Sequence, residues 1–302
     1  MRAARIAVVG SFVTDLVFRA PRRPERGETL IGHRLDVFEG GKGFNQAVAA
    51  ARAGAEVVMI GRMGNDEFGA RFLAALEREN IDATHVVRDE HNATGVASPL
   101  VEDSGHNSIV LVPRANAALS AADVERARAA ISAADVLLLQ LEVPMAASLL
   151  AAEIARQAGR SVVLNPAPAL AGSDALIAAA HVVVPNELEA ASLTDCASAR
   201  EAARTLLERG VPVVVVTLGE RGSLLLDASG ERALPAHAVD VVDTTAAGDA
   251  FCGALAVALA EGAPASDAVA FANAAGALAV TRLGAEPSMP KRAAIEELLR
   301  NG

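Results

Sequence analysis

Short apolar runs that alternate with helical segments constrain the fold of this chain more than any other feature. We expect strands at the apolar runs, which are residues 6–9, 57–61, 136–140, 162–165, 182–184, 213–216 and 224–226. Apolar spacing and glycine stops predict helices over 45–53, 66–79, 120–132, 145–158, 186–194, 198–210, 246–261, 265–281 and 291–300. Strands that are apolar throughout are buried on both faces, which is typical of a doubly wound, mostly parallel sheet in an α/β protein. The 302 residues contain no repeat or linker, so we expect a single domain over 1–302.

Two further pairs of predicted strands have a different pattern. Residues 12–19 and 29–38 form one pair, and residues 94–101 and 107–112 form the other. Polar and apolar residues alternate in these segments, so each suits a sheet with one exposed face. We therefore expect a small second sheet, built from about 12–38 and 94–112, that stands off the main sheet.

The carboxyl ends of the predicted strands are the expected place for a ligand. In an open parallel sheet, ligands bind in the crevice beyond those ends. The segments concerned are 10–11, 140–142, 165–166, 185–186, 217–219 and 243–249. Several of them have a carboxylate or a side-chain amide close to the strand end, so chemistry is expected there.

Residues 243–255 place small residues and a glycine before an aspartate at the start of a predicted helix. Unpaired N–H groups and the positive end of the dipole attract phosphate at such a site. Ala246, Ala247 and Gly248 leave these amides uncovered, and Asp249 would lie where a base for a phosphate-accepting hydroxyl is needed. The simpler alternative is that Asp243 or Thr244 caps the helix and Asp249 favours its dipole.

Charge and composition argue against several classes of partner. A formal charge of −10, a pI near 5.2 and the lack of a basic block disfavour nucleic acid and anionic membranes. No apolar run reaches the roughly 18 residues of a membrane span, and the run after Arg5 is too short for a signal peptide. Cys196 and Cys252 lie far apart without metal-ligand spacing, so we expect reduced cysteines and a cytoplasmic protein.

Lys42 is one of only two lysines among 27 basic residues, and it lies between Gly41 and Gly43. A compact ammonium fits where a guanidinium fork would not. The glycines would let the backbone approach a small polyol, with Lys42 and Asn45 as donors; a flexible glycine turn before a helix is the alternative. The sequence has neither a Gly-Lys-Ser/Thr phosphate loop nor a dinucleotide fingerprint, which disfavours a dinucleotide-dependent oxidoreductase.

Asn186 and Glu189 allow two interpretations that are compatible with each other. An asparagine at a helix start with a glutamate three positions later is a variant of the capping box. The two side chains could also orient water around a Mg²⁺ ion that is held mainly by nucleotide phosphates. The six histidines are scattered without ligand spacing, and we assign them no role.

Two motifs resemble the signatures of the ribokinase-like (PfkB) carbohydrate kinases. They are Glu-Gly-Gly-Lys-Gly-Phe-Asn-Gln-Ala at 39–47 and Asp-Thr-Thr-Ala-Ala-Gly-Asp at 243–249. Further segments that resemble ribokinases follow in the same order along the whole chain, at 27–29, 140–142, 165–168, 185–187, 217–219 and 281–285. The resemblance implies a ribokinase-like fold whose small sheet is a lid. It also implies ATP-dependent phosphorylation of a primary sugar hydroxyl, with ribose converted to ribose 5-phosphate as the expected reaction.

The resemblance further implies catalytic and substrate-binding roles. Asp249 would deprotonate the sugar hydroxyl, and the amides of Ala246, Ala247 and Gly248 would stabilise the transferring phosphoryl group. The residues implied to hold the sugar are Asp15, Gly41, Lys42, Asn45, Glu142 and Asp249. Those implied to bind ATP are Asn186, Thr217, Gly219, Gly248 and Asn273.

Two ions and a second subunit are also implied by the resemblance. Asn186 and Glu189 would organise Mg²⁺ through water. The positions that match a K⁺ site are Asp243 and Ser288, with carbonyl groups from Thr245, Arg282 and Gly284. The lid would close over the sugar and join two subunits in a homodimer.

Two departures from the family pattern leave the substrate open. Val13 stands where ribokinases usually have an asparagine that binds the sugar, and Phe44 replaces a small residue. Because the loss of one amide can change specificity among polyols, another pentose, a ketohexose or a nucleoside is the alternative substrate. A non-catalytic sugar- or nucleotide-binding regulator is an alternative of another class, and the presence of Asp249 and its preceding glycine argues against it.

Overall fold

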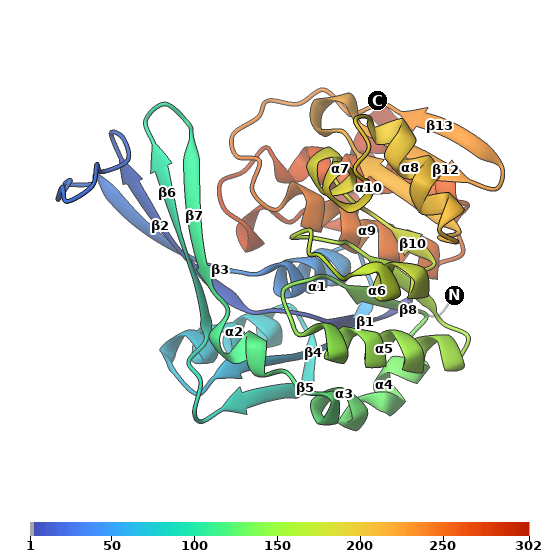
Figure 1. The fold of residues 1–302 in the computed structure, drawn as a ribbon, viewed down its shortest axis with the longest axis horizontal. Helices are drawn as coiled ribbons and strands as arrows, with labels where there is room; N and C mark the ends of the chain where they lie inside the picture. The colour runs from blue at the N-terminus through green and yellow to red at the C-terminus, as the bar shows by residue number, and fades with distance from the viewer. Residues whose placement is uncertain (1–2, 302) are drawn as a thin grey trace.

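The computed structural model describes residues 3–301, whose strands form two separate sheets (Figure 1). The strands of the larger sheet are β1 (Arg5–Val9), β4 (Glu56–Gly64), β5 (Asp82–Asp89), β8 (Val136–Leu139), β9 (Ser161–Leu164), β10 (Val182–Val183), β11 (Val213–Thr217), β12 (Ser223–Asp227) and β13 (Gly230–Leu234). Their order is β13-β12-β11-β10-β9-β8-β1-β4-β5. Pairing is parallel from β5 to β11 and antiparallel only at β12 and β13. The predicted doubly wound, mostly parallel sheet is confirmed.

Helices cover both faces of this sheet because its strands bury both faces. Along β1, Ile6 and Val8 join one apolar core while Ala7 and Val9 join the other, as the alternation of side chains along a strand requires. The first core is covered by α1 (Lys42–Arg52), α2 (Glu67–Arg78), α9 (Ala247–Ala260), α10 (Ala265–Ala279) and α11 (Arg292–Asn301). The second is covered by α3 (Ala121–Arg126), α4 (Arg128–Ala133), α5 (Met145–Gln157), α6 (Asp174–Ala179), α7 (Glu187–Thr194) and α8 (Ala199–Glu208). Within residues 3–301, no helix is both long enough and apolar enough to span a membrane.

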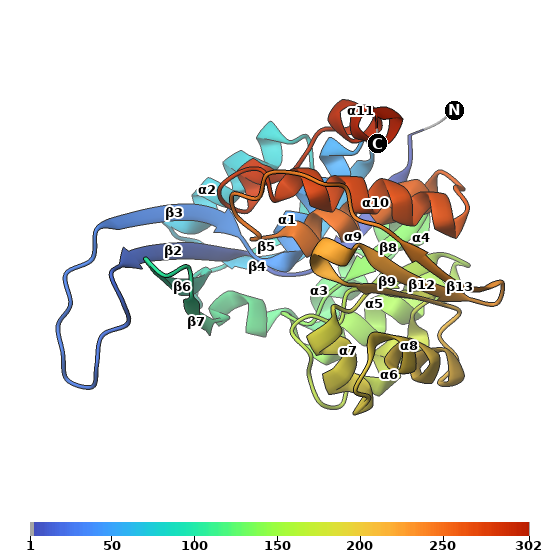
Figure 2. The ribbon, with the colours of Figure 1, turned by 90° about the horizontal axis from the view of Figure 1, so that it is seen from above.

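The small second sheet is also present. It consists of β2 (Val13–Ala20), β3 (Arg34–Gly40), β6 (Gly95–Glu102) and β7 (Asn107–Val112), in the order β3-β2-β6-β7. Strand β2 pairs antiparallel with β3 and parallel with β6, and β6 pairs antiparallel with β7. Figures 1 and 2 both show this sheet projecting from one side of the layered body. The predicted strand over 29–38 is shorter than expected, since residues 29–33 belong to the loop before β3.

Several elements differ from the sequence-based prediction. The structure adds β5, β13, α6 and three short 3₁₀ turns, η1 (Arg114–Ala118), η2 (Gly219–Arg221) and η3 (Glu286–Ser288). Strands β5 and β13 are the two edges of the large sheet, where polar residues interrupt the apolar pattern that marks central strands. The helix predicted over 120–132 is divided into α3 and α4, and α1 begins at Lys42 rather than at residue 45.

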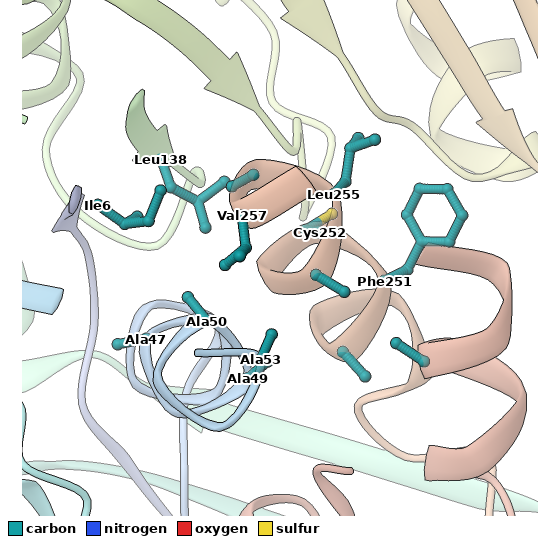
Figure 3. Packing of buried hydrophobic residues seen from close by; sticks show 14 of the residues in the cluster. Ile6, Ala47, Ala49, Ala50, Ala53, Leu138, Phe251, Cys252, Leu255 and Val257 are labelled. Atoms are coloured by element: carbon teal, nitrogen blue, oxygen red, sulfur yellow. The ribbon is translucent and has the colours of Figure 1, made fainter. Parts of the chain in front are cut away.

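Small residues let α1 and α9 approach each other closely. Figure 3 shows alanines of α1, among them Ala49 and Ala50, facing the turn of α9 that follows Phe251. A Cβ added at Gly253 of α9 would lie 2.5 Å from the Cβ of Ala49 and 2.9 Å from the backbone nitrogen of Ala50. This contact brings the start of α9 against the start of α1, where both predicted motifs lie.

Candidate active site

The first turn of α9 presents a bare helix N-terminus. Its N-cap is Ala246, in the left-handed region with φ +59°, and no side chain caps the helix. The alternative that Asp243 caps it is therefore wrong: the carboxylate of Asp243 accepts instead from Thr245 and from the backbone nitrogen of Gly284. A Cβ added at Gly248 would meet no atom within 4 Å, so the space in front of this turn is open.

Asp249 lies in that first turn and is held by two neighbouring residues of α1. Asn45 Nδ2 donates to Asp249 Oδ2 at 2.9 Å, and Gln46 Nε2 donates to Asp249 Oδ1 at 2.9 Å. The Asp249 side chain is buried in the protein but borders a cavity of about 220 Å³. The predicted site residues that line this cavity are Lys42, Asn186, Glu189, Thr217, Ala246, Ala247, Gly248 and Asp249.

The residues predicted to hold a sugar form a buried acidic group around one ammonium. Glu142 Oε2 accepts from Ser11 Oγ at 2.5 Å and from the backbone nitrogen of Lys42 at 2.9 Å. Burial, reinforced by the charges of Glu142 and Asp249, raises the pKa of Asp15 to about 7. Burial also raises the pKa of Glu142, against the opposing effect of Lys42. Burial alone would lower the pKa of the Lys42 ammonium, but the surrounding carboxylates outweigh it and raise that pKa.

Two features make this region suited to a small polar molecule. The Oδ1 atom of Asn45 is buried and has no hydrogen-bond partner in the structure. Gly41 has φ +89°, and a Cβ there would lie 2.7 Å from the backbone nitrogen of Val13, so only glycine fits. Phe44, by contrast, is fully buried and packs its ring against Phe72 with 5.0 Å between centroids. Its departure from the family pattern therefore concerns the apolar core.

Asn186 and Glu189 form the predicted capping box at the start of α7. Asn186 Oδ1 accepts from Glu189 N at 2.8 Å, and Glu189 Oε2 accepts from Asn186 N at 2.8 Å. Both side chains also border the cavity, and burial raises the pKa of Glu189. Within residues 3–301, no group of three or more His, Cys, Asp or Glu side chains could hold a metal ion.

The other residues predicted to contact ATP are spread along the same edge. Thr217 ends β11, borders the cavity and forms a parallel bridge with Asn186. Gly219 lies two residues later with φ +60°, and a Cβ added there would meet no atom within 4 Å. Asn273 of α10 donates to the carbonyl oxygens of Leu234, the last residue of β13, and of Pro235, each at 3.4 Å. Gly219 and Asn273 are not among the residues that line the cavity.

The structure brings together some of the residues predicted to hold K⁺. Asp243 Oδ2 accepts from Gly284 N at 2.9 Å, and Asp243 Oδ1 accepts from Thr245 Oγ1 at 2.7 Å. These hydrogen bonds lower the pKa of Asp243 against the effect of burial. Ser288 is buried in η3, and its hydroxyl donates to the carbonyl oxygen of Ala285 at 2.8 Å. Arg282 lies in the same segment, and its backbone nitrogen donates to the carbonyl oxygen of Ala279 at 3.3 Å.

Sequence reasoning gave no role to four polar residues that the structure places at the site. Ser11 contacts Glu142, while Gln46, Gln140 and Asn165 form a hydrogen-bonded group that contacts Asp249 through Gln46. Three of the four lie in segments that follow central strands, and this position in the sequence could have marked them as candidate site residues. Gln46 lies inside a helix, where only its place in the glycine motif could have marked it.

Comparisons with known proteins agree with this geometry. Residues 3–292 match the model of the pfkB family of carbohydrate kinases. The chain is 41% identical over 301 residues to the ribokinase of Haemophilus influenzae, covering 98% of each chain. It is 36% identical over 300 residues to the deoxyribokinase of Salmonella typhimurium, covering 97% of this chain and 98% of the relative. The structure of Arabidopsis thaliana ribokinase complexed with ribose and ATP matches with a TM-score of 0.88 at 32% identity, covering 99% of both chains. Since the family model spans almost all of the chain, this protein belongs to the pfkB family of carbohydrate kinases.

Proposed function

We propose that this protein transfers the γ-phosphoryl group of ATP to the primary hydroxyl of ribose and forms ribose 5-phosphate. The observation that carries the proposal is the position of Asp249 in the uncapped first turn of α9, at the border of a polar cavity. The names of the relatives support ribose and ATP as the substrates.

Asp249 is the proposed general base. Its two oxygens are each held by a side-chain amide of α1, so the carboxylate keeps one orientation while a sugar hydroxyl approaches. The hydroxyl oxygen attacks the γ-phosphorus while Asp249 accepts its proton, and the bond from the γ-phosphorus to the bridging oxygen breaks to release ADP. The proton leaves the oxygen as the new bond to phosphorus forms, which avoids a free alkoxide.

The first-turn amides of α9 are the proposed site of the transferring phosphoryl group. The amides of Ala246, Ala247 and Gly248 lie at the positive end of the helix dipole, with no side chain in front of them. The nitrogen of Ala247 makes only a long contact of 3.4 Å with the carbonyl oxygen of Thr244. These donors therefore need little rearrangement to accept an anion.

The proposed sugar pocket consists of Asp15, Gly41, Lys42, Asn45 and Glu142. Carboxylates that accept hydroxyl protons and an ammonium that donates suit a polyol. The unpaired Asn45 Oδ1 supports this assignment, because a buried carbonyl oxygen without a donor is costly and a sugar hydroxyl would satisfy it. The protein would thereby hold the acceptor hydroxyl beside Asp249.

The proposed nucleotide side comprises Asn186, Thr217, Gly219 and Asn273, with Mg²⁺ near Asn186 and Glu189. When bound, Mg²⁺ neutralises phosphate charge, and the lack of a protein metal cluster in residues 3–301 fits an ion that arrives with ATP. A K⁺ ion is proposed beside Asp243 and Ser288, with the carbonyls of Thr245, Arg282 and Gly284. The hydrogen bond between Asp243 and Gly284 supports this by joining the two segments involved.

The small sheet is the proposed lid and the proposed dimer contact. It carries exposed apolar side chains that a monomer would leave in water, among them Ile109 and Val110 on β7, which are 58% and 68% exposed. A second copy of this sheet would cover them. With ATP as the donor and both cysteines unpaired, we propose that the reaction takes place in the cytoplasm.

The assignment of ribose as the substrate can be tested by measuring ADP release with a panel of acceptors. The panel contains ribose, 2-deoxyribose, another pentose, a ketohexose and a nucleoside, since Val13 lacks the amide found in ribokinases and one relative is a deoxyribokinase. We expect the highest kcat/KM with ribose. A higher kcat/KM with another acceptor would reassign the substrate, and ribose binding without ADP release would favour the non-catalytic regulator.

A further inference from the structure

Three buried amide side chains form a hydrogen-bonded group that contacts the Asp249 carboxylate through Gln46, and one of them, Asn165, also borders the cavity. Gln46 and Gln140 are completely buried, and Asn165 is 7% exposed. Gln46 comes from α1, while Gln140 and Asn165 directly follow β8 and β9. The group therefore joins the ends of two central strands to the helix that packs against α9. A Cβ at Gly10 would lie 2.3 Å from Gln140 Oε1, so the lack of a side chain at Gly10 leaves room for this amide.

One backbone carbonyl sets the direction of every hydrogen bond in this group. Val184 O can only accept, so Asn165 Nδ2 faces it at 2.8 Å and Asn165 Oδ1 faces Gln46. Gln46 Nε2 therefore donates to Asn165 Oδ1 at 3.1 Å and to Asp249 Oδ1 at 2.9 Å. The Oε1 atom of Gln46 accepts from Gln140 Nε2 at 2.6 Å. Reversing the Gln46 amide would set its oxygen against two other oxygens.

We propose that Gln46, oriented by Gln140 and Asn165, is a positioning residue that keeps the Asp249 carboxylate aimed at the acceptor hydroxyl. The inference rests on the proposed function, because it takes Asp249 as the base. Asn45 alone would hold one carboxylate oxygen and leave the group free to turn about its last bond. The second donor, from the next residue of α1, removes that freedom.

Charged and titratable groups also act on Asp249 from the elements around it. They are Asp15 on β2, Lys42 on α1, Glu142 after β8, Glu189 on α7 and Cys252 on α9. None of them is altered by an uncharged substitution of Gln46 or Gln140. A change in the acid side of the pH profile of such a variant therefore reports the lost hydrogen bond.

Gln46→Met tests the proposal, because it removes the donor and keeps the side-chain length. We expect kcat to fall by about 10²-fold, as for a reacting group misplaced by about 1 Å, while the KM for ribose stays within about threefold. The acid limb of the kcat profile should move to higher pH, because a carboxylate that loses an N–H donor takes up a proton more readily.

Gln140 should act only through Gln46. Gln140→Met alone should lower kcat less than Gln46→Met, because Asn165 and Asp249 still hold the Gln46 amide. Added to Gln46→Met, it should cause no further loss of kcat, which a double-mutant cycle measures.

Asn116→Leu is the matched control for the loss of a buried amide. Asn116 is fully buried, and its side-chain amide donates to the carbonyl oxygen of Phe12 and accepts from the Phe12 backbone nitrogen. This variant should lose stability and keep the wild-type pH profile. A titration of the Asp249 carboxyl ¹³C signal, assigned by its absence in Asp249→Asn, gives a readout that needs no turnover. The expected result is a higher titration midpoint in Gln46→Met than in the wild type.

The outcomes separate the positioning role from the proposed function. A wild-type protein without ADP release would refute the kinase proposal, and the ¹³C titration would still test the hydrogen bond. An active wild type with the same acid limb and the same ¹³C midpoint in Gln46→Met would overturn the positioning role. Additive losses in the Gln46 and Gln140 double variant would do so as well.

Discussion

The contact between α1 and α9 predicts a large effect of one added methyl group at Gly253. In Gly253→Ala the new Cβ would lie 2.5 Å from the Cβ of Ala49 and 2.8 Å from the carbonyl oxygen of Gln46. Carbon atoms in contact are about 3.5–4.0 Å apart, so the two helices have to separate by about 1 Å. Overpacking of this kind costs about 1–3 kcal/mol of stability. A displacement of about 1 Å between Asp249 and its donors on α1 should lower kcat by about 10²-fold.

The assay compares urea unfolding with steady-state ADP release in Gly253→Ala and in a matched control. Gly276→Ala adds the same methyl group on α10, where the nearest atom, the carbonyl oxygen of Ala247, is 3.4 Å away. This control should gain about 0.5–1 kcal/mol, since glycine inside a helix costs that amount relative to alanine, and should keep its kcat. Ala49→Gly should restore part of the loss in Gly253→Ala by removing the nearest atom.

Wild-type stability and kcat in Gly253→Ala would refute the account of the α1 and α9 contact. Equal losses in Gly253→Ala and in Gly276→Ala would also contradict it, because the control lacks the close approach.

Three further predictions concern pH, K⁺ and assembly. Because burial raises the pKa of Asp15 from 3.8 to about 7, the free energy of unfolding contributed by this group falls as pH rises between those values. Asp15→Asn should abolish this part of the pH dependence in urea unfolding. In the wild type, the KM for ribose should fall as Asp15 ionises near pH 7, whereas the KM of the variant should not change in this way. Asp243→Ala should remove any stimulation of turnover by K⁺ over Na⁺, and equal stimulation in the variant would contradict the K⁺ assignment. Ile109→Lys places a charge on the exposed apolar strand β7 and should convert the proposed dimer to a monomer in sedimentation experiments; a dimeric variant would exclude β7 from the interface.

The central part of the fold could be predicted from sequence because its strands are buried on both faces. In β8 all four residues, Val136–Leu139, are buried, so an unbroken apolar run is a direct consequence of its position. The edge strand β5 carries Asp, Thr and His between its apolar residues and was missed for the same physical reason. The early start of α1 depends on tertiary packing: a Cβ at Gly43 would lie 2.3 Å from the backbone nitrogen of Ser11.

At the site, short sequence motifs identified several residues that line the cavity. They did not identify the residues that hold those side chains in place. Asp249 and Lys42 stand in short motifs whose glycines and small residues are visible in sequence. The hydrogen bond from Gln46 to Asp249 joins residues 203 positions apart, and no local pattern encodes such a contact. For Phe44, the motif was misleading in the other direction. Because Phe44 replaces a small residue inside the sugar-binding motif, it suggested an altered sugar pocket, but its ring packs in the apolar core against Phe12 and Phe72.

Asp249→Asn tests most directly whether one carboxylate, in the first turn of α9, activates the sugar hydroxyl. The variant keeps the size of the side chain and removes the base. The account predicts that ribose-dependent ADP release falls by about 10²–10⁴-fold, the usual contribution of a general base. Ribose binding measured by calorimetry should change little. Turnover equal to that of the wild type would contradict the claim.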